Sequence, residues 1–161
     1  MKLKTLGMTA AAVAVAAGAG GKATSGDVNS VWYARQRKPS YQPPAQVFPI
    51  VWPLLYTDIA LVSADAIDGL SQEGDQQAAR GFWAALAVNL GLNASWSWVF
   101  FNRHRAGLAA LTAAALTASS ADLTRRAVAV NGGRAAPLAA YPAWCAFATV
   151  LSTHIWWLNR R

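Results

Sequence analysis

Apolar residues fall into five long runs separated by short charged segments. The runs cover, approximately, residues 6–21, 47–67, 81–101, 106–125 and 137–158. A helix needs about 20 predominantly apolar residues to cross the hydrocarbon of a bilayer. The second, third and fifth runs meet this length, and the fourth meets it when it is extended toward residue 130. The pattern therefore predicts an all-α membrane protein, with up to five of these runs as transmembrane helices.

The first run has two interpretations. It follows the basic start MKLK, is rich in alanine, and has small residues at 17–19. These features are typical of a cleaved signal peptide. They are equally compatible with a weakly hydrophobic first helix that is retained. The pattern alone leaves both open.

Composition supports a chain that lies partly in lipid. Hydrophobic residues make up 55% of the 161 residues and charged residues only 13%, about half the charged fraction of a typical soluble domain. Eight tryptophans and a single cysteine are present. Cys145 therefore cannot form a disulfide within the chain.

The net charge of +7 is spread in small clusters beside the apolar runs, as at membrane boundaries. The clusters are Lys2/Lys4, Arg35/Arg37/Lys38, Arg103/Arg105, Arg125/Arg126 and Arg160/Arg161. Nucleic-acid binding needs a continuous basic surface, so we expect no nucleic-acid partner. With alternating spans, the side that holds the C-terminus carries eight of the fourteen basic residues, which favours a cytoplasmic C-terminus.

Conventional catalytic and metal-binding motifs are missing from the sequence. Its two histidines, His104 and His154, have no apparent third ligand beside them. We therefore expect no metal site and no required cofactor.

The third run has two different faces. Asn89 and Asn93 are four residues apart and lie on one helix face, which Trp96 and Phe100 continue. Two amides in hydrocarbon are costly unless they are hydrogen-bonded. They either bond to another helix or line a ligand cavity, and the pattern does not distinguish the two. The opposite face carries only small residues suited to close helix packing, namely Ala84, Ala87, Gly91 and Ser95.

Two other runs place aromatic and small residues together. Trp52 and Tyr56 share a face in the second run, and Trp144, Ala148 and Ser152 share one in the fifth. Asp58 and Asp65 lie seven residues apart on one stripe of the second run. Such carboxylates serve either a proton relay or, as we favour, paired or boundary positions.

Five of the seven prolines lie within residues 38–56, KPSYQPPAQVFPIVWPLLY. Pro39, Pro43 and Pro44 stiffen the connection before the second run, because proline fixes φ. Pro49 and Pro53 fall near the start of the following helix, where proline is tolerated. The arrangement predicts a semi-rigid lid loop between the first two helices, with Trp52 and Tyr56 beneath it.

The segment that starts at Trp32 resembles the signature of the TspO/MBR family, which includes bacterial tryptophan-rich sensory proteins and the mitochondrial translocator protein. The matching positions are Trp32-Tyr33, Lys38-Pro39, Tyr41, Pro43-Pro44, Val47-Phe48-Pro49, Trp52 and Leu55-Tyr56. Asn93, Trp96 and Val99-Phe100-Phe101 resemble the family's third-helix motif. Tyr141, Trp144, Phe147-Ala148, Leu151-Ser152, Ile155-Trp156 and Leu158-Asn159 resemble its fifth-helix motif.

The resemblance implies a five-transmembrane-helix bundle with a retained first helix. The abundance of alanine and the excess of arginine over lysine indicate a bacterial cell membrane. The resemblance also implies a homodimer, for which the small face of the third run is the candidate surface. Protoporphyrin IX or a similar tetrapyrrole is the implied ligand. The expected ligand-binding residues are Trp32, Tyr41, Trp52, Tyr56, Asn89, Asn93, Trp96, Phe100, Trp144, Ala148 and Ser152.

Two classes of function remain open. One is a sensor, regulator or transporter that binds tetrapyrroles in an intramembrane pocket. The alternative is an enzyme that degrades bound porphyrin with light and oxygen, for which Trp52 and Trp144 are the candidate catalytic residues.

Overall fold

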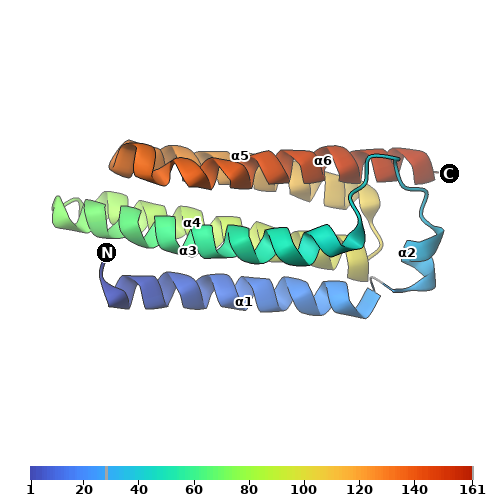
Figure 1. Cartoon of the computed structure of the whole chain (residues 1–161), viewed down its shortest axis with the longest axis horizontal. Helices are drawn as coiled ribbons and strands as arrows, with labels where there is room; N and C mark the ends of the chain where they lie inside the picture. The colour runs from blue at the N-terminus through green and yellow to red at the C-terminus, as the bar shows by residue number, and fades with distance from the viewer. Residues whose placement is uncertain (28, 161) are drawn as a thin grey trace.

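Five helices of 20 to 26 residues lie side by side along one axis (Figure 1). The computed structural model describes the backbone of residues 1–27 and 29–160, and every regular element in that part of the chain is helical. Arg161 lies outside the described residues. In chain order the elements are α1 (Leu3–Asp27), α2 (Val31–Arg35), η1 (Ala45–Val47), α3 (Phe48–Gln72), α4 (Gln76–Ser97), η2 (Trp98–Asn102), α5 (Ala106–Asn131), η3 (Gly132–Ala139) and α6 (Ala140–Asn159).

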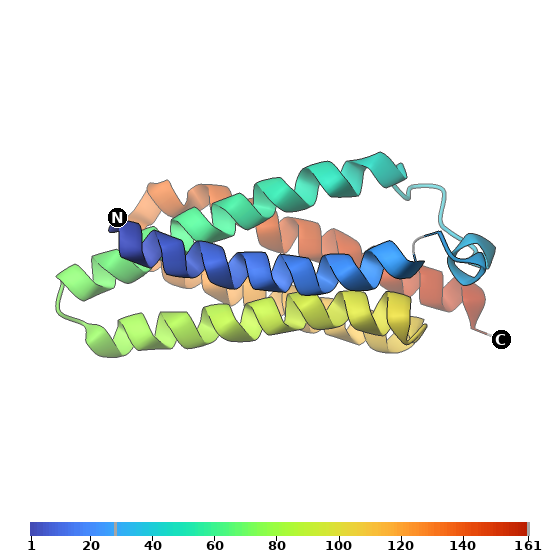
Figure 2. The ribbon, with the colours of Figure 1, turned by 90° about the horizontal axis from the view of Figure 1, so that it is seen from below.

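The long helices form three layers. α1 lies on one side of the bundle, α3 and α4 in the middle, and α5 and α6 on the other side (Figure 1). Seen from below, α1 lies in front of and between α3 and α4 (Figure 2). α1 therefore contributes one wall of any space that these three helices enclose.

Four stretches of the described chain are long and apolar enough to cross a membrane. They are Leu3–Ser25, Ala45–Gln72, Gln76–Asn102 and Ala106–Asn159. The last stretch has 54 residues and contains both α5 and α6. Length and composition thus support an integral membrane bundle.

The helices extend beyond the apolar runs of the sequence. α1 continues to Asp27 and α3 to Gln72, whereas the corresponding runs end near residues 21 and 67. A helix is held by backbone hydrogen bonds, which polar residues form as well as apolar ones, so a helix does not have to stop where its apolar run stops. The segment before α3, which we expected to be a continuous loop, also holds the short helix α2.

The amino end of α1 is fixed by α3. The carboxylate of Asp68, only 2% exposed, accepts hydrogen bonds from the backbone N–H of Lys2 and from Thr5 Oγ1, the latter at 2.6 Å. Thr9 Oγ1 donates to the carbonyl of Ala60 at 2.9 Å. The negative charge of a carboxylate near the amino end of a helix also interacts favourably with the helix dipole. These bonds attach the first half of α1 to the second half of α3.

The carboxyl half of α1 lies instead against the end of α4. The indole Nε1 of Trp98 donates to the carbonyl of Ala19 at 3.1 Å. A Cβ atom on Gly20 would lie 3.2 Å from Ser97 Oγ, closer than an ordinary contact. The absence of a side chain at Gly20 therefore permits this close packing, as small residues do between membrane helices.

Candidate functional site

A cavity of about 950 Å³ lies between α1, α3 and the end of α4. Most of its wall is aliphatic or aromatic, and no charged side chain of the described residues lines it. Its lining residues are Leu6, Ala10, Val13, Ala14, Ala17, Gly20, Gly21, Thr24, Tyr33, Gln42, Ala45, Phe48, Pro49, Trp52, Pro53, Tyr56, Thr57, Ala60, Leu61, Asn93, Trp96, Ser97, Phe100, Phe101, Leu151, Ser152 and Ile155. Its volume is at the upper end of the 300–1,000 Å³ that is typical of small-molecule sites.

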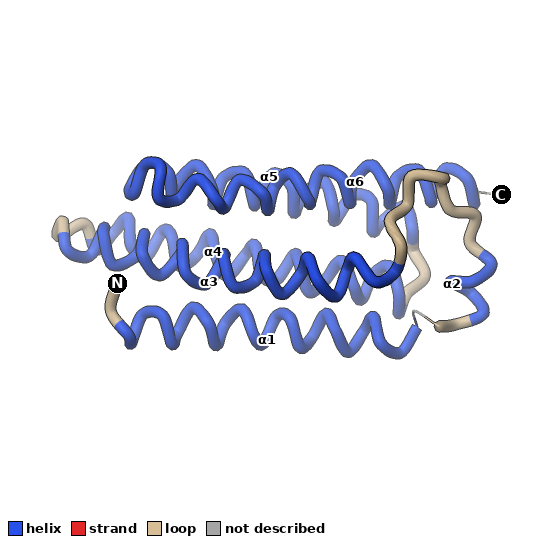
Figure 3. The backbone as a smooth tube through the Cα atoms, viewed as in Figure 1, coloured by secondary structure: helices blue, strands red, loops and turns tan. Residues whose placement is uncertain are grey.

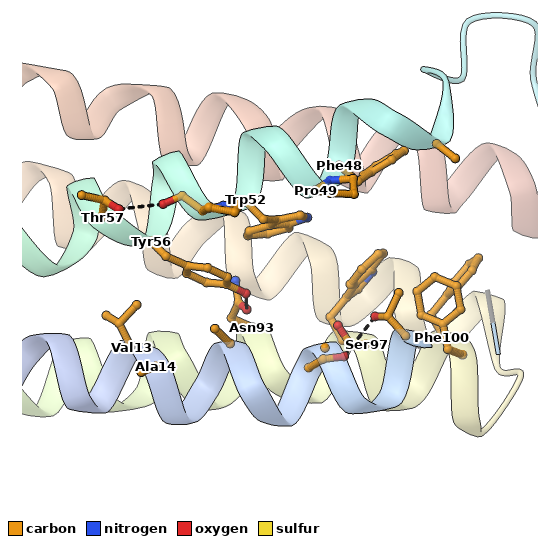
Figure 4. A pocket seen from close by; sticks show the side chains of 18 of the residues that line it. Val13, Ala14, Phe48, Pro49, Trp52, Tyr56, Thr57, Asn93, Ser97 and Phe100 are labelled. Carbon is orange, nitrogen blue, oxygen red and sulfur yellow. Dashed lines mark hydrogen bonds between the residues drawn. The ribbon is translucent and has the colours of Figure 1, made fainter. Parts of the chain in front are cut away.

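The α3 wall is aromatic. Trp52 and Tyr56 are one helical turn apart and project toward α1, where Val13 and Ala14 lie on the opposite wall (Figure 4). The two rings are stacked, with centroids 5.4 Å apart and planes 29° apart. A flat aromatic or conjugated ligand fits against such a surface, because aromatic rings pack well in offset stacks.

Two prolines lie near the start of α3 and change its backbone hydrogen bonding. Pro49 lies at the amino end of α3 and Pro53 inside it, and both line the cavity. Because Pro53 has no N–H, the helical hydrogen bond to the carbonyl of Pro49 cannot form. This part of α3 therefore keeps a backbone acceptor beside the cavity.

The amides of α4 belong to a chain of hydrogen bonds that crosses the bundle. Tyr56 Oη donates to Asn93 Oδ1 at 2.8 Å, and Asn93 Nδ2 donates to Tyr141 Oη at 3.2 Å. Tyr141 Oη donates in turn to Asn89 Oδ1 at 2.9 Å, and Asn89 Nδ2 donates to Ser119 Oγ at 3.2 Å. The chain joins α3, α4, α5 and α6, so both asparagines bond to other helices. Asn93 also lines the cavity.

The α1 wall consists of small residues. Ala10, Ala14 and Gly21 line the cavity and are exposed, whereas Val13 is only 4% exposed. Small side chains leave room that leucine or phenylalanine at these positions would fill. The alanine-rich sequence of α1 thus helps to explain the size of the cavity.

The proline-rich segment, residues 36–47, lies at one end of the bundle (Figure 3). Asn159 of α6 holds it through two hydrogen bonds of 2.9 Å, from the Arg37 N–H to Asn159 Oδ1 and from Asn159 Nδ2 to the Arg37 carbonyl. The hydroxyl of Tyr41 is 3.0 Å from His154 Nδ1. Both contacts reach the last turns of α6, so this helix anchors the segment beside the cavity.

Two side chains connect the segment and α2 to the cavity. Gln42 Nε2 donates to Tyr33 Oη at 3.3 Å, and both residues line the cavity. Burial raises the pKa of Tyr33 further above its ordinary value, so its hydroxyl stays neutral well beyond physiological pH. Lys38 Nζ lies 4.0 Å from the centre of the Tyr33 ring, a cation–π contact. The ammonium group of Lys38 therefore contacts the ring of Tyr33, an uncharged residue of the cavity wall.

The cavity also has buried polar atoms without partners. Among the described residues, Gln42 Oε1 and Trp96 Nε1 are buried and make no hydrogen bond. Leaving such groups unpaired costs about 1–3 kcal/mol each. Since both residues line the cavity, these two atoms are unpaired hydrogen-bonding groups in its wall.

Six of the eleven residues expected to bind ligand line this cavity, and five do not. Those that line it are Trp52, Tyr56, Asn93, Trp96, Phe100 and Ser152. Those that do not are Trp32, Tyr41, Asn89, Trp144 and Ala148. Trp32 stacks on His104 with ring centroids 4.1 Å apart, and Trp144 packs against Phe48 at 5.8 Å. The shared face of Trp144, Ala148 and Ser152 thus contributes only its last residue to the wall.

Sequence reasoning missed many residues of the wall, and two groups of them stand out. One is the whole contribution of α1, whose alanine-rich sequence carries no functional signal. The other is the pair Tyr33 and Gln42. Both lie within the segment that carries the family signature, so that signature was a usable signal for them.

The two aspartates of the second run have different surroundings. Asp65 Oδ2 accepts hydrogen bonds from Arg134 Nη2 at 2.6 Å and from Asn131 Nδ2 at 2.9 Å. Asp65 is therefore a paired carboxylate, one of the two positions that we favoured. Asp58 is half-buried, and the structure shows neither a hydrogen bond nor an ion pair for it. Within the described residues, no group of three His, Cys, Asp or Glu side chains could hold a metal ion.

Comparison with known proteins agrees with this arrangement. The model of the TspO/MBR family matches residues 8–158, so the chain belongs to the TspO/MBR family of integral membrane proteins. The translocator protein of Homo sapiens is 30% identical over 132 residues, which cover 78% of this chain and 73% of that protein.

Two bacterial relatives are more similar over a shorter stretch. Protein CrtK of Rhodobacter capsulatus is 36% identical over 75 residues, 46% of this chain and 44% of that protein. The tryptophan-rich sensory protein of Cereibacter sphaeroides is 38% identical over 74 residues, 46% of this chain and 42% of that protein. In these two comparisons the matched stretch covers less than half of each relative.

Proposed function

We propose that the protein binds porphyrins and similar flat, apolar molecules in the cavity between α1, α3 and α4. The observation that carries this proposal is a cavity of about 950 Å³ whose described wall is uncharged and includes the stacked pair Trp52 and Tyr56. A porphyrin macrocycle is flat and conjugated, so it can stack on these rings. Asn93 and Ser152 supply polar groups at the edge of the same wall.

The charged groups of such a ligand need a different environment from its ring. A carboxylate in an uncharged wall would lose its hydration without gaining a partner. Arg35, Arg37 and Lys38 are exposed at the end of the bundle where Tyr33 and Gln42 line the cavity. The propionates of protoporphyrin IX would therefore point toward these cations, with the macrocycle inside.

The proline-rich segment acts in this proposal as a semi-rigid lid. Its two ends are fixed by the Asn159–Arg37 bonds and by the start of α3, and Gln42 reaches the cavity wall between them. Pro39, Pro43 and Pro44 limit its flexibility. Ligand exchange then requires the lid to detach from α6.

In the membrane we propose five crossings, because α5 and α6 have 26 and 20 residues and each is long enough to cross. The basic residues favour a cytoplasmic C-terminus in a bacterial cell membrane. We further propose a homodimer through the small face of α4. Ala84, Ala87, Gly91 and Ser95 are all exposed on the described chain, which leaves that face available to a second copy.

Binding is tested directly by titrating the purified protein with protoporphyrin IX and following the quenching of tryptophan fluorescence. Trp52→Ala should raise the dissociation constant roughly tenfold, since stacking and buried area are lost. Trp157→Ala is the matched control, because Trp157 is 54% exposed and does not line the cavity. Saturable binding that is equal in all three proteins would place the ligand elsewhere, and no binding would reject the proposal.

The enzymatic alternative has partial support, since Trp52 lines the cavity but Trp144 does not. Illumination of the protein with protoporphyrin IX in air, followed by absorbance, tests it. Degradation that persists in the Trp52→Phe, Trp144→Phe double variant, with binding retained, would remove these two indoles from the chemistry.

A further inference from the structure

A second cavity lies at the end of the bundle opposite the proline-rich segment, beside the start of α1 (Figure 1). It has a volume of about 420 Å³, within the range that is typical of small-molecule sites. Its lining residues are Met1, Leu61, Val62, Asp65, Asn131, Arg134 and Ala135. Aliphatic side chains, a carboxylate, an amide and a guanidinium therefore share one wall.

The ion pair in this cavity leaves atoms on both partners unused. Asp65 accepts its two hydrogen bonds through Oδ2, from Arg134 Nη2 at 2.6 Å and from Asn131 Nδ2 at 2.9 Å. No hydrogen bond from the described residues reaches Asp65 Oδ1. Guanidinium has five N–H donors, and the Arg134 side chain is 73% exposed. The cavity thus presents a free anionic oxygen beside free cationic donors.

The backbone fixes this arrangement. α5 ends at Asn131, and the next residue, Gly132, has a φ of +55°, a region that favours glycine. The turn brings Arg134 back toward α3. A Cβ atom on Gly69 of α3 would lie 3.3 Å from Asn131 Oδ1, closer than an ordinary contact. The acid on α3 and its two partners are therefore held together by a close approach of two helices.

The depth of Asp65 in the membrane makes its free oxygen costly. The candidate span Ala45–Gln72 has 28 residues, about 42 Å at 1.5 Å per residue, and a bilayer with its headgroup regions is about 40–45 Å thick. Asp65 lies seven residues before the end of this span, about 10 Å from the membrane face. Because polar groups near the hydrocarbon need partners, a donor for Asp65 Oδ1 would stabilise the protein.

A phosphatidylethanolamine headgroup has the complementary groups. Its primary ammonium can donate to Asp65 Oδ1, and its phosphate oxygens can accept from the fork of Arg134, which suits phosphate geometry. The acyl chains can follow Leu61, which is 41% exposed and lies one helical turn from Asp65 toward the middle of the span. Each of the three parts of this lipid therefore meets a matching part of the cavity.

From these observations we propose that the second cavity binds phosphatidylethanolamine. The ammonium lies on Asp65, the phosphate on Arg134 and an acyl chain along Leu61. This binding does not depend on the proposed occupancy of the main cavity, and it predicts that the protein selects one phospholipid of the surrounding bilayer.

The test titrates the full chain, purified in detergent and depleted of lipid, with dioleoyl phosphatidylethanolamine or dioleoyl phosphatidylcholine. Native mass spectrometry measures the bound lipid. The two lipids share phosphate and acyl chains, but the choline group has no N–H to donate. The variants are Asp65→Asn and Arg134→Gln. The controls are Asp58→Asn, on the same stripe of α3, and Arg125→Gln, whose side chain is 70% exposed and bonds to Asp122; neither control residue lines a described cavity.

We expect the wild type to bind its first phosphatidylethanolamine roughly tenfold tighter than phosphatidylcholine, because a charged hydrogen bond is gained. Asp65→Asn should abolish this preference and change the affinity for phosphatidylcholine less than about threefold. Arg134→Gln should weaken both lipids roughly tenfold, since the phosphate loses its partner. Asp58→Asn and Arg125→Gln should bind as the wild type does.

Several results would overturn the proposal. One is equal affinity of the wild type for the two lipids, and another is a preference that persists in Asp65→Asn. Soluble glycerophosphoethanolamine, which has no acyl chains, is added as a competitor. If it binds as tightly as the lipid, the site takes a free phosphoester and the assignment to a lipid is wrong. If Asp65→Asn does not fold, equal binding by Arg134→Gln and Arg125→Gln overturns the proposal instead.

Discussion

Tyr56 of α3 and Asn93 of α4 are joined by a hydrogen bond of 2.8 Å, and both side chains line the cavity (Figure 4). The same Asn93 donates to Tyr141, which is completely buried. The polar centre of the bundle and the wall of the cavity are therefore one structure. A change made for binding at this position also acts on stability.

Replacement of Asn93 by leucine should destabilise the protein. The Tyr56 hydroxyl would lose its acceptor and the Tyr141 hydroxyl its donor, at a cost of about 1–3 kcal/mol. Tyr56→Phe removes one bond and leaves Asn93 its bond to Tyr141, so its cost should be about 0.6 kcal/mol, the average for polar contacts between membrane helices. Reversible unfolding in mixed micelles measures both, and a larger loss for Tyr56→Phe than for Asn93→Leu would contradict this order.

Filling the cavity from α1 should abolish ligand binding without unfolding the bundle. Ala17 lines the cavity and Ala11 is exposed on another face of the same helix. Ala17→Trp places an indole in the space that a porphyrin would occupy, and we expect the dissociation constant to rise more than about tenfold. Titration with protoporphyrin IX measures this, and Ala11→Trp is the control that should bind normally. Equal affinity of the two variants would exclude the α1 wall from the site.

Loss of the Asn159 side chain should release the proline-rich segment. Asn159→Leu removes the two 2.9 Å hydrogen bonds to the Arg37 backbone. Hydrogen exchange at residues 36–42 should rise, and ligand dissociation should speed up roughly fivefold, as expected for about 1 kcal/mol. Amides of residues 72–76, at the opposite end, serve as the internal control. Unchanged exchange at residues 36–42 would show that these bonds do not hold the segment.

Substitution of Asp68 should detach the amino end of α1. Asp68→Leu removes the acceptor of the Thr5 hydroxyl and of the Lys2 N–H, and we expect a loss of about 2 kcal/mol. Asp58→Leu is the comparison on the same helix, because Asp58 makes no hydrogen bond or ion pair in the structure. Unfolding in mixed micelles measures both variants. Equal stability of the two would mean that Asp68 contributes no more than an unpaired carboxylate.

The apolar runs predicted the helical membrane class, and helical periodicity predicted that Trp52 and Tyr56 share a face. The family resemblance placed Asn93 with them in one binding site. The sequence did not predict that Trp144 would turn toward Phe48 instead, since periodicity does not tell which neighbouring helix a face meets. The alternatives for Asn93 were both realised, as it bonds to other helices and also lines the cavity.

The α1 wall shows a different limit. Its alanines gave no signal, because an alanine that makes room for a ligand cannot be told by sequence from one that packs against a helix. Binding of a porphyrin is the prediction that the titrations test, and dimerisation through Ala84, Ala87, Gly91 and Ser95 is a separate prediction.

The contact between Asp68 and the start of α1 has a consequence for biogenesis. The ribosome makes α1 first, yet the carboxylate that receives its amino end belongs to α3, some sixty residues further along the chain. The amino end of α1 therefore cannot form these hydrogen bonds until α3 has been inserted into the bilayer. Only then can the α1 wall pack against α3, so the cavity cannot take up a ligand before α3 has been inserted.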